Sequence, residues 1–495
     1  MEDDKEPLVN VEPPVVLLRT TRYRWLILAI FALFSLLQSA VWDTWGPISV
    51  SATQVVGFTD HDYDLLSNWA PIGIMTTMPF FIWLINNKGA RLSVIFGGTL
   101  VAMGTGLRCI PLPSSTWKYF IHAGQLLSAI AGCPVLGAAP LISNTWFPPN
   151  ERVFATSCMV LIGNIGNAAS FLIGPAIVNR PNNCTGGQNL STTTHATYTD
   201  RNEVMTNVTL APIVPLTTTS CSDNTEEMRK QIKYYLYGEF AIAVLILVSI
   251  VISFQNKPDV PPSVSAGIER LDILAGLKTL SKKYSFWVVT ISFALACGAF
   301  YGWFGIVTVL MTPHNVSETE VGNVAFVMTI CGSVLGILTG WFADRIKGKL
   351  KWLLFSCYII MAVVFLYLAI IILDWINVPP FKFTKAGFWV SFILFGSLSS
   401  VIQPLGMELT ADIAYPVSEG TSISVVTWFI MLSMFIFLLI LNSVPNQDIS
   451  MYLVLIFTGL AAPFLAMSAK NENVRLELDK NTRTSNRHNP RSIVN

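Results

Sequence analysis

The sequence predicts an all-α polytopic membrane protein with twelve transmembrane helices. Of its 495 residues, 52% are hydrophobic and only 12% are charged, whereas a soluble domain carries about 25% charged residues. The chain also contains repeated apolar runs of about 20 residues, the length needed to cross a bilayer as a helix. Backbone amides within a bilayer must be paired inside the protein, and the alternating pattern of a β-barrel is missing, so each run is predicted to be a helix.

The apolar runs divide the chain into two sets of six. We expect a cytosolic tail, a first six-helix bundle, a central cytosolic linker, a second six-helix bundle and a second cytosolic tail. The long loop inside the first bundle, 179–233, is rich in Thr and Asn and is predicted to be a glycosylated cover. The five segments in order are 1–23, 24–254, 255–284, 285–469 and 470–495.

Basic residues and glycosylation motifs predict the same orientation. With the N-terminus in the cytosol, the cytosolic segments hold 22 of the 31 Lys and Arg residues, as the positive-inside rule requires. Asn-x-Ser/Thr motifs then fall on the opposite, lumenal side, where glycosylation takes place. They lie at Asn183, Asn189, Asn207 and Asn315. Both termini are therefore predicted to be cytosolic.

Two of the eight cysteines, Cys184 and Cys221, lie in the predicted lumenal loop. A disulfide between them is chemically possible in that compartment. The sequence leaves their pairing open, because spacing does not determine connectivity.

Two short loops at matching positions in the halves resemble each other. After the second apolar run the chain reads WLINNKGAR, with Gly89 and Arg91, and after the eighth it reads GWFADRIKGK, with Gly340, Asp344 and Arg345. The second loop resembles the G-x-x-x-D-R-x-x-G motif of the major facilitator superfamily, whereas the first has Asn86 in place of the aspartate. A carboxylate here would hold a helix N-terminus, and glycine would permit a tight turn. Two such copies in a six-plus-six chain predict a secondary transporter.

Longer segments resemble solute carrier family 49, the feline leukaemia virus subgroup C receptor-related transporters. The segments that carry the likeness are VWDTWGPIS (41–49), GTGLRCIP (104–111), WFPPNER (146–152), GAFY (298–301) and ELTADIAYPVSEGTS (408–422). Among members of that family, the likeness is to a lysosomal one. The resemblance implies a proton-driven carrier that exports pyridoxine (vitamin B6) from lysosomes. Other members handle choline, ethanolamine or haem.

The resemblance also implies substrate-binding residues. Trp42 and Tyr301 align with the aromatic residues that line the family's substrate cavity, where two rings can hold a flat or cationic ligand. Trp69 and Gln125 are further candidates, and the alternative for the aromatic residues is a place in the membrane-interface belt. Some choline-transporting members carry glutamines where this chain has Ile165 and Met431, which argues against choline.

Proton coupling requires a group that titrates between an acidic lumen and the cytosol. The candidates are Glu239, His122 and Glu408. Histidine titrates near pH 6.5, and a carboxylate within a membrane is functional by default. Structural pairing is the alternative for each of them.

The N-terminal tail carries a sorting-like motif. Asp4, Leu8 and Val9 fit the acidic dileucine pattern except for the final valine. The motif predicts a lysosomal destination and a clathrin adaptor as a partner.

Other functions remain as alternatives. A choline, ethanolamine or haem facilitator belongs to the same class, and a nutrient sensor that binds without transport belongs to another. No nucleophile–base pair, metal-ligand spacing, phosphate loop or basic block stands out. We therefore expect no enzyme activity, cofactor, metal or nucleic-acid partner; the expected partners are a small-molecule substrate, protons and the lipid bilayer.

Overall fold

The structure is a computed structural model of the whole chain. It describes residues 18–179, 219–268, 270–304, 307–311, 314, 316, 318–346, 348–376, 378, 381–443, 448–467 and 475. The predicted glycosylation sites at Asn183, Asn189, Asn207 and Asn315 lie outside these residues, as do the sorting residues Asp4, Leu8 and Val9. Cys184 also lies outside them, and the side chain of Cys221 is not described, so their pairing stays a prediction.

Seven helices form the first bundle. They are α1 (Tyr23–Trp42), α2 (Ser49–Val56), α3 (Asp60–Arg108), α4 (Ser114–Ile130), α5 (Gly132–Trp146), α6 (Arg152–Ile177) and α7 (Thr219–Ser253). The 49-residue α3 is interrupted at Gly89, where φ is 83°, so it contains two segments on either side of this residue. Helices α4 and α5 follow each other directly and together cross the bundle once.

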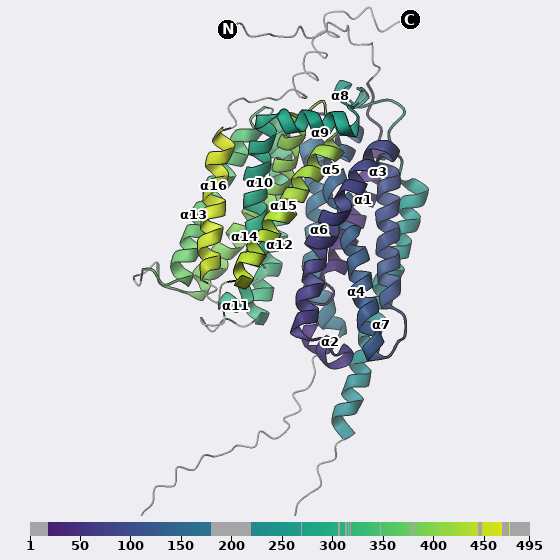
Figure 1. Cartoon of the computed structure of the whole chain (residues 1–495), viewed down its shortest axis with the longest axis vertical. Coiled ribbons are helices and arrows are strands. Elements are labelled where there is room, and N and C mark those ends of the chain that lie inside the picture. Colours follow the sequence, from purple (N-terminus) through teal and green to yellow (C-terminus); the bar gives the residue numbers. More distant parts are fainter. Residues whose placement is uncertain are drawn as a thin grey trace, which may run out of the picture.

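Two short helices connect this bundle to a second one. The connecting helices are α8 (Val264–Gly267) and α9 (Ile273–Lys282), and α9 lies across the ends of the long helices (Figure 1). The second bundle contains α10 (Tyr284–Phe304), α11 (Val307–Met311), α12 (Glu318–Arg345), α13 (Leu350–Ile372), α14 (Lys385–Ala414), α15 (Glu419–Ser443) and α16 (Ile449–Met467).

Eleven helices among the described residues are long and apolar enough to cross a membrane. One of them is α3, whose two segments each have spanning length, so the eleven helices supply twelve crossings. The all-α polytopic fold predicted from the apolar runs is confirmed.

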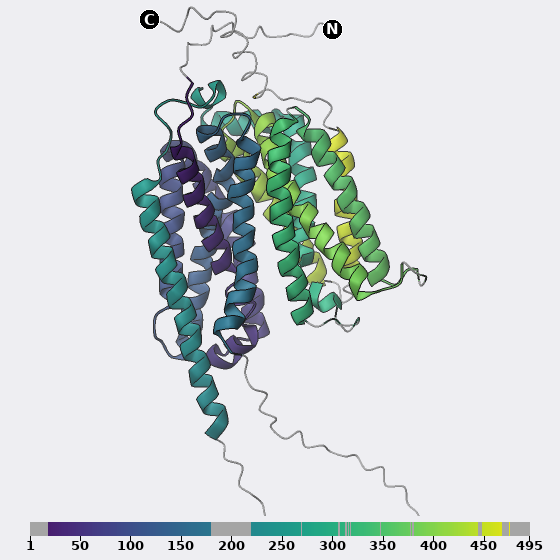
Figure 2. The ribbon, with the colours of Figure 1, turned by 180° about the vertical axis from the view of Figure 1, so that it is seen from behind.

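The long helices of both bundles run roughly parallel (Figures 1 and 2). We call the end that carries α8 and α9 the α9 end, and the opposite end, with α2 and α11, the α2 end. In both views the ribbons of the two bundles lie closer together toward the α9 end than toward the α2 end.

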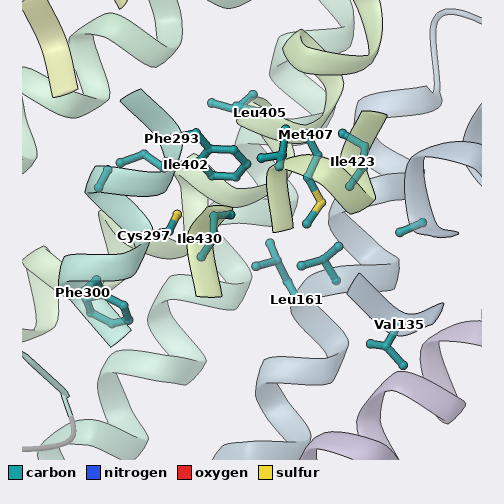
Figure 3. Packing of buried hydrophobic residues seen from close by; sticks show 14 of the residues in the cluster. Val135, Leu161, Phe293, Cys297, Phe300, Ile402, Leu405, Met407, Ile423 and Ile430 are labelled. Carbon is teal, nitrogen blue, oxygen red and sulfur yellow. The ribbon is translucent and has the colours of Figure 1, made fainter. Parts of the chain in front are cut away.

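Apolar side chains pack between the bundles as well as within them. Figure 3 shows residues of one buried cluster that come from both bundles: Val135 and Leu161 from the first, and Ile402, Met407, Ile423 and Ile430 from the second. All six are buried. A smaller apolar cluster at the α2 end joins α2 and the loop before it to α4 and α7 through Trp45, Ile48, Ala52, Trp117 and Ile232. This cluster fixes the connection that follows α1.

The last part of the predicted 179–233 loop is helical, because α7 begins at Thr219. Met228 and Ile232 are buried on one face of this extension. Glu226 precedes Lys230 by four residues, a spacing that stabilises a helix. Glu239 therefore lies well inside α7, 20 residues after its first residue.

Candidate functional site

A buried ion pair lies inside the first bundle, within membrane-spanning helices. The guanidinium of Arg108 on α3 is fully buried, and its Nη1 lies 4.0 Å from Oε2 of Glu239 on α7. Oε1 of Glu239 accepts a hydrogen bond of 2.6 Å from the Thr44 hydroxyl. A carboxylate removed from water is costly unless it is paired, so Arg108 and Thr44 are what hold Glu239 in this place.

Gln125, a predicted substrate ligand, belongs to the same cluster. Its Oε1 accepts a 2.6 Å hydrogen bond from Nη2 of Arg108, and its Nε2 donates a 2.9 Å bond to the carbonyl of Trp42. Both ends of the amide are therefore engaged within the first bundle. The Trp42 ring is half-buried at the last residue of α1, and its backbone is tied to Arg108 through Gln125.

His122 forms a second cluster nearer the α2 end. Its Nδ1 accepts a 3.3 Å hydrogen bond from Nε1 of Trp69, and its Nε2 lies 3.4 Å from Oδ1 of Asp62. The other Asp62 oxygen lies 3.6 Å from Nζ of Lys118 and caps α3 through Thr59. Trp69 and His122, predicted separately for substrate and protons, are thus neighbours.

Tyr301 lies in a third cluster, which crosses between the bundles. Nε2 of Gln403 on α14 donates to the Tyr301 hydroxyl on α10. Oε1 of Gln403 accepts a 3.3 Å hydrogen bond from Nδ2 of Asn164 on α6. The structure gives no contact between the Trp42 and Tyr301 rings; each is placed by different partners.

The two loops with the predicted superfamily motif lie at the α9 end and join the bundles. Oδ1 and Oδ2 of Asp344 on α12 accept hydrogen bonds of 3.1 and 2.9 Å from the backbone N–H groups of Val153 and Phe154. A carboxylate at this helix N-terminus satisfies amides that have no partner within α6. In the first loop, Asn86 donates to the hydroxyl of Thr421 near the start of α15. Asn86 therefore holds the start of α15 as Asp344 holds the start of α6, but without a charge.

The remaining motif residues stabilise the conformation of these loops and the close packing around them. At Gly89 a side chain would collide with Asn256, because a Cβ would lie 2.2 Å from Asn256 Nδ2. Arg91 donates to the carbonyl of Val251 at 3.1 Å. At Gly340 a Cβ would lie 2.2 Å from the Ser157 hydroxyl of α6, so glycine permits the close approach of α12. The Arg345 guanidinium lies 3.3 Å from the centre of the Trp341 ring.

Glu408 is at the α9 end, within a buried charge network. Its Oε1 accepts from the hydroxyls of Thr156 and Ser143 in the first bundle, and its Oε2 lies 2.7 Å from Nη2 of Arg475. Arg475 also contacts Asp412 at 2.6 Å and Glu419 at 3.5 Å. Burial lowers the pKa of the Arg475 guanidinium, but the three carboxylates raise it above its ordinary value, so the side chain stays charged.

The hydrogen bonds that the described residues make between bundles lie from mid-depth to the α9 end. At the α9 end they involve Asp344, Asn86 and Glu408, as given above. At mid-depth, Asn164 bonds Gln403, and Nε1 of Trp428 on α15 donates a 3.1 Å bond to the carbonyl of Met75 on α3. The bundles are therefore joined at one end, which is the geometry of an alternating-access carrier closed on that side.

Comparisons with known proteins agree with this geometry. A profile described as "Major Facilitator Superfamily" matches residues 233–438. The E. coli fucose:proton symporter FucP has the same fold, with a TM-score of 0.65 at 12% identity over 91% of this chain and all of its own. The fold, the profile match and the two motif loops that join the bundles define a transporter of the major facilitator superfamily.

The family follows from closer relatives. The Xenopus tropicalis protein called "Solute carrier family 49 member 4 homolog" is 33% identical over 420 residues, 85% of each chain. The human "Choline/ethanolamine transporter FLVCR2" is 24% identical over 82% of this chain and 69% of its own. The chain belongs to solute carrier family 49, which confirms the family predicted from its short motifs.

Four residues that form the clusters described above were not among the candidates predicted from the sequence: Arg108, Asn164, Gln403 and Arg475. Arg108 stands in the quoted GTGLRCIP segment, and an arginine within an apolar run is a signal that could have found it. The amide groups of Asn164 and Gln403 carry no such signal. Arg475 lies in a polar tail, where nothing in the local sequence indicates burial.

Proposed function

We propose that this protein is a proton-coupled secondary transporter that moves a small polar vitamin, most specifically pyridoxine, from the lysosome to the cytosol. The α9 end faces the cytosol in this proposal, because the positive-inside rule assigns the loops of that end to it. The sorting-like residues Asp4, Leu8 and Val9 support the lysosomal destination through a clathrin adaptor. Pyridoxine is proposed from the family resemblance.

The observation that carries proton coupling is the ion pair of Arg108 with Glu239. The pair lies inside membrane-spanning helices, where an ionisable group is expensive and most often functional. Protonation of Glu239 neutralises it and leaves Arg108 with its hydrogen bonds to Gln125, Ser128 and the Val41 carbonyl. The guanidinium thus keeps these three hydrogen bonds in both protonation states, but it loses its counter-ion when Glu239 is protonated, and this loss couples the proton to the position of Arg108.

The pair also connects the proton to the proposed substrate site. Gln125 bonds Arg108 on one side and the Trp42 backbone on the other, so a shift of Arg108 on protonation of Glu239 is transmitted to the end of α1. A proton falling from about pH 5 to about pH 7 releases about 2.7 kcal/mol, at about 1.36 kcal/mol per pH unit. One coupled proton therefore sustains a substrate gradient of roughly a hundredfold.

Uptake of radiolabelled pyridoxine tests the proposal. Cells would express the protein with Leu8→Ala and Val9→Ala, so that part of it reaches the plasma membrane, and uptake would be measured at external pH 5.5 and 7.5. We expect uptake that is faster at pH 5.5 and is lost in Trp42→Ala at equal surface expression. No uptake at either pH, with the protein at the surface, would contradict the pyridoxine proposal.

A choline or ethanolamine carrier is the second candidate. The human relative named a choline/ethanolamine transporter supports it, together with the aromatic residues Trp42 and Tyr301, since aromatic faces bind cations. The same cells would be tested with labelled choline and ethanolamine. Uptake of these amines that pyridoxine does not inhibit would favour this candidate.

A further inference from the structure

We propose that Asn164, Gln403 and Tyr301 form an uncharged substrate clamp at the middle of the carrier, and that it selects a neutral ligand with hydroxyl or ring-nitrogen groups over a quaternary ammonium. The inference deepens the proposed function, because the ligand is the transported substrate. It adds Asn164 and Gln403 to the aromatic residues that the family resemblance implied.

The clamp lies at mid-depth and draws on both bundles. Asn164 is 12 residues from the start of α6 and Gln403 is 11 residues from the end of α14. At 1.5 Å per residue, these positions are about 18 and about 16 Å from the α9 end, near the middle of a hydrocarbon core of about 30 Å. The Asn164–Gln403 bond and the bond from Trp428 to Met75 are at comparable depth, and together they close the side that leads to the α9 end.

The chemistry of the clamp is amide and phenol. Each amide offers both a donor and an acceptor, and the phenol offers both in one hydroxyl. The described carboxylates on the same helix, Glu408 and Asp412, lie five and nine residues further toward the α9 end, and both are paired with Arg475. A ligand with hydroxyl groups can replace the hydrogen bonds of the clamp. The quaternary ammonium of choline has no N–H to donate, so choline offers the clamp one hydroxyl where pyridoxine offers three hydroxyls and a ring nitrogen. Choline would therefore leave more of the buried polar groups unpaired, which is costly.

Asn167 on α6 supplies a further polar group beside the clamp. Oδ1 of Asn167 is shielded from solvent and has no hydrogen-bond partner among the described residues. Asn167 follows Asn164 by three residues, so the two side chains lie on one side of α6. This oxygen is a free acceptor for a ligand hydroxyl next to the clamp.

The clamp also explains how binding opens the carrier. The Asn164–Gln403 bond crosses from one bundle to the other, so it must break when the bundles separate at this depth. A ligand whose groups bond both amides takes over those bonds as they part. A ligand that can bond neither leaves the bundles joined, which makes the clamp a determinant of transport as well as of affinity.

The test measures ligand-induced thermal stabilisation of the purified full-length protein with pyridoxine, nicotinamide and choline, and uptake of the same compounds. The variant is Gln403→Met, which keeps length and removes the amide. Its matched control is Gln38→Met, because Gln38 is equally buried, at 8% against 7% exposed, but donates within the first bundle to the Ser128 carbonyl. Tyr301→Phe removes the hydroxyl and keeps the ring.

We expect Gln403→Met and Tyr301→Phe to weaken binding of the neutral ligands at least tenfold, with choline binding changed less than twofold and Gln38→Met like wild type. Wild-type binding of choline in preference to the neutral compounds would overturn the inference, as would unchanged pyridoxine binding by Gln403→Met. An equal loss of all three ligands in that variant would also overturn it. Binding of a neutral compound other than pyridoxine, or binding without uptake, would contradict the proposed function and leave the clamp standing.

Discussion

The proposed proton coupling depends on the protonation of single side chains, chiefly that of Glu239. Sequence analysis could single out Glu239 and His122 because an ionisable residue in an apolar run is conspicuous. It could not pair Glu239 with Arg108 or His122 with Asp62, since these pairs are brought together only by the packing of different helices. Different partners place Trp42 and Tyr301, through Gln125 and Gln403 respectively, and their role in substrate binding stays a prediction from the family resemblance.

Removal of the Glu239 charge tests the coupling. In Glu239→Gln the side chain keeps an acceptor for Thr44 but has no proton to exchange. We predict that the ratio of pyridoxine uptake at pH 5.5 to that at pH 7.5 falls to about one, with any remaining uptake driven by the substrate gradient alone. Glu227→Gln, an exposed change on the same helix, should keep the wild-type ratio. A wild-type pH ratio in Glu239→Gln would remove Glu239 from the proton path.

At the scale of elements, the predictable features were those with a local cause. The length of the apolar runs predicted the spanning helices, and the glycines of the motif predicted the tight turns at the α9 end. The start of α7 at Thr219 was not predicted because its first turns are polar. Only Met228 and Ile232 mark an apolar face there, and this face is buried by packing against α2 and α4. A polar loop and a helix that extends beyond the bilayer have similar compositions.

The turn inside α3 makes a separate prediction. Gly89→Ala places a Cβ at a left-handed φ of 83° and 2.2 Å from Asn256 Nδ2, so both strain and a collision result. We expect a loss of about 1–3 kcal/mol in stability, seen as a lower midpoint of thermal unfolding. Gly459→Ala in α16, where no atom lies within 4 Å of the new Cβ, should leave the midpoint equal or raise it. Equal midpoints for the two variants would show that the Gly89 turn relaxes freely.

For the whole molecule, the distribution of contacts between the bundles determines which end is closed. The charge network around Arg475 stabilises closure at the α9 end, because Glu408 on α14 also accepts hydrogen bonds from the first bundle. The network was not predictable from the sequence. Its arginine lies in a polar tail, and its carboxylates come from α14 and α15.

Loss of Arg475 should therefore open the α9 end. Arg475→Ala leaves Glu408, Asp412 and Glu419 buried without their cation, and breaking a buried pair costs about 3–5 kcal/mol. Spin labels at the exposed positions Lys88 and Trp352 should report a longer distance between bundles in a larger fraction of molecules. Lys385→Ala breaks the half-exposed pair with Glu320, worth at most about 1 kcal/mol, and should leave the distances unchanged. The same distances in Arg475→Ala as in wild type would exclude this role.

In the proposed symport, substrate and proton cross the membrane together. This coupling can be measured with purified protein in liposomes that contain a pH-sensitive dye, with pyridoxine added outside and no initial pH difference. We predict that pyridoxine entry acidifies the liposome interior, and that Glu239→Gln abolishes the acidification. Entry of labelled pyridoxine into the same liposomes without any change in internal pH would contradict the account.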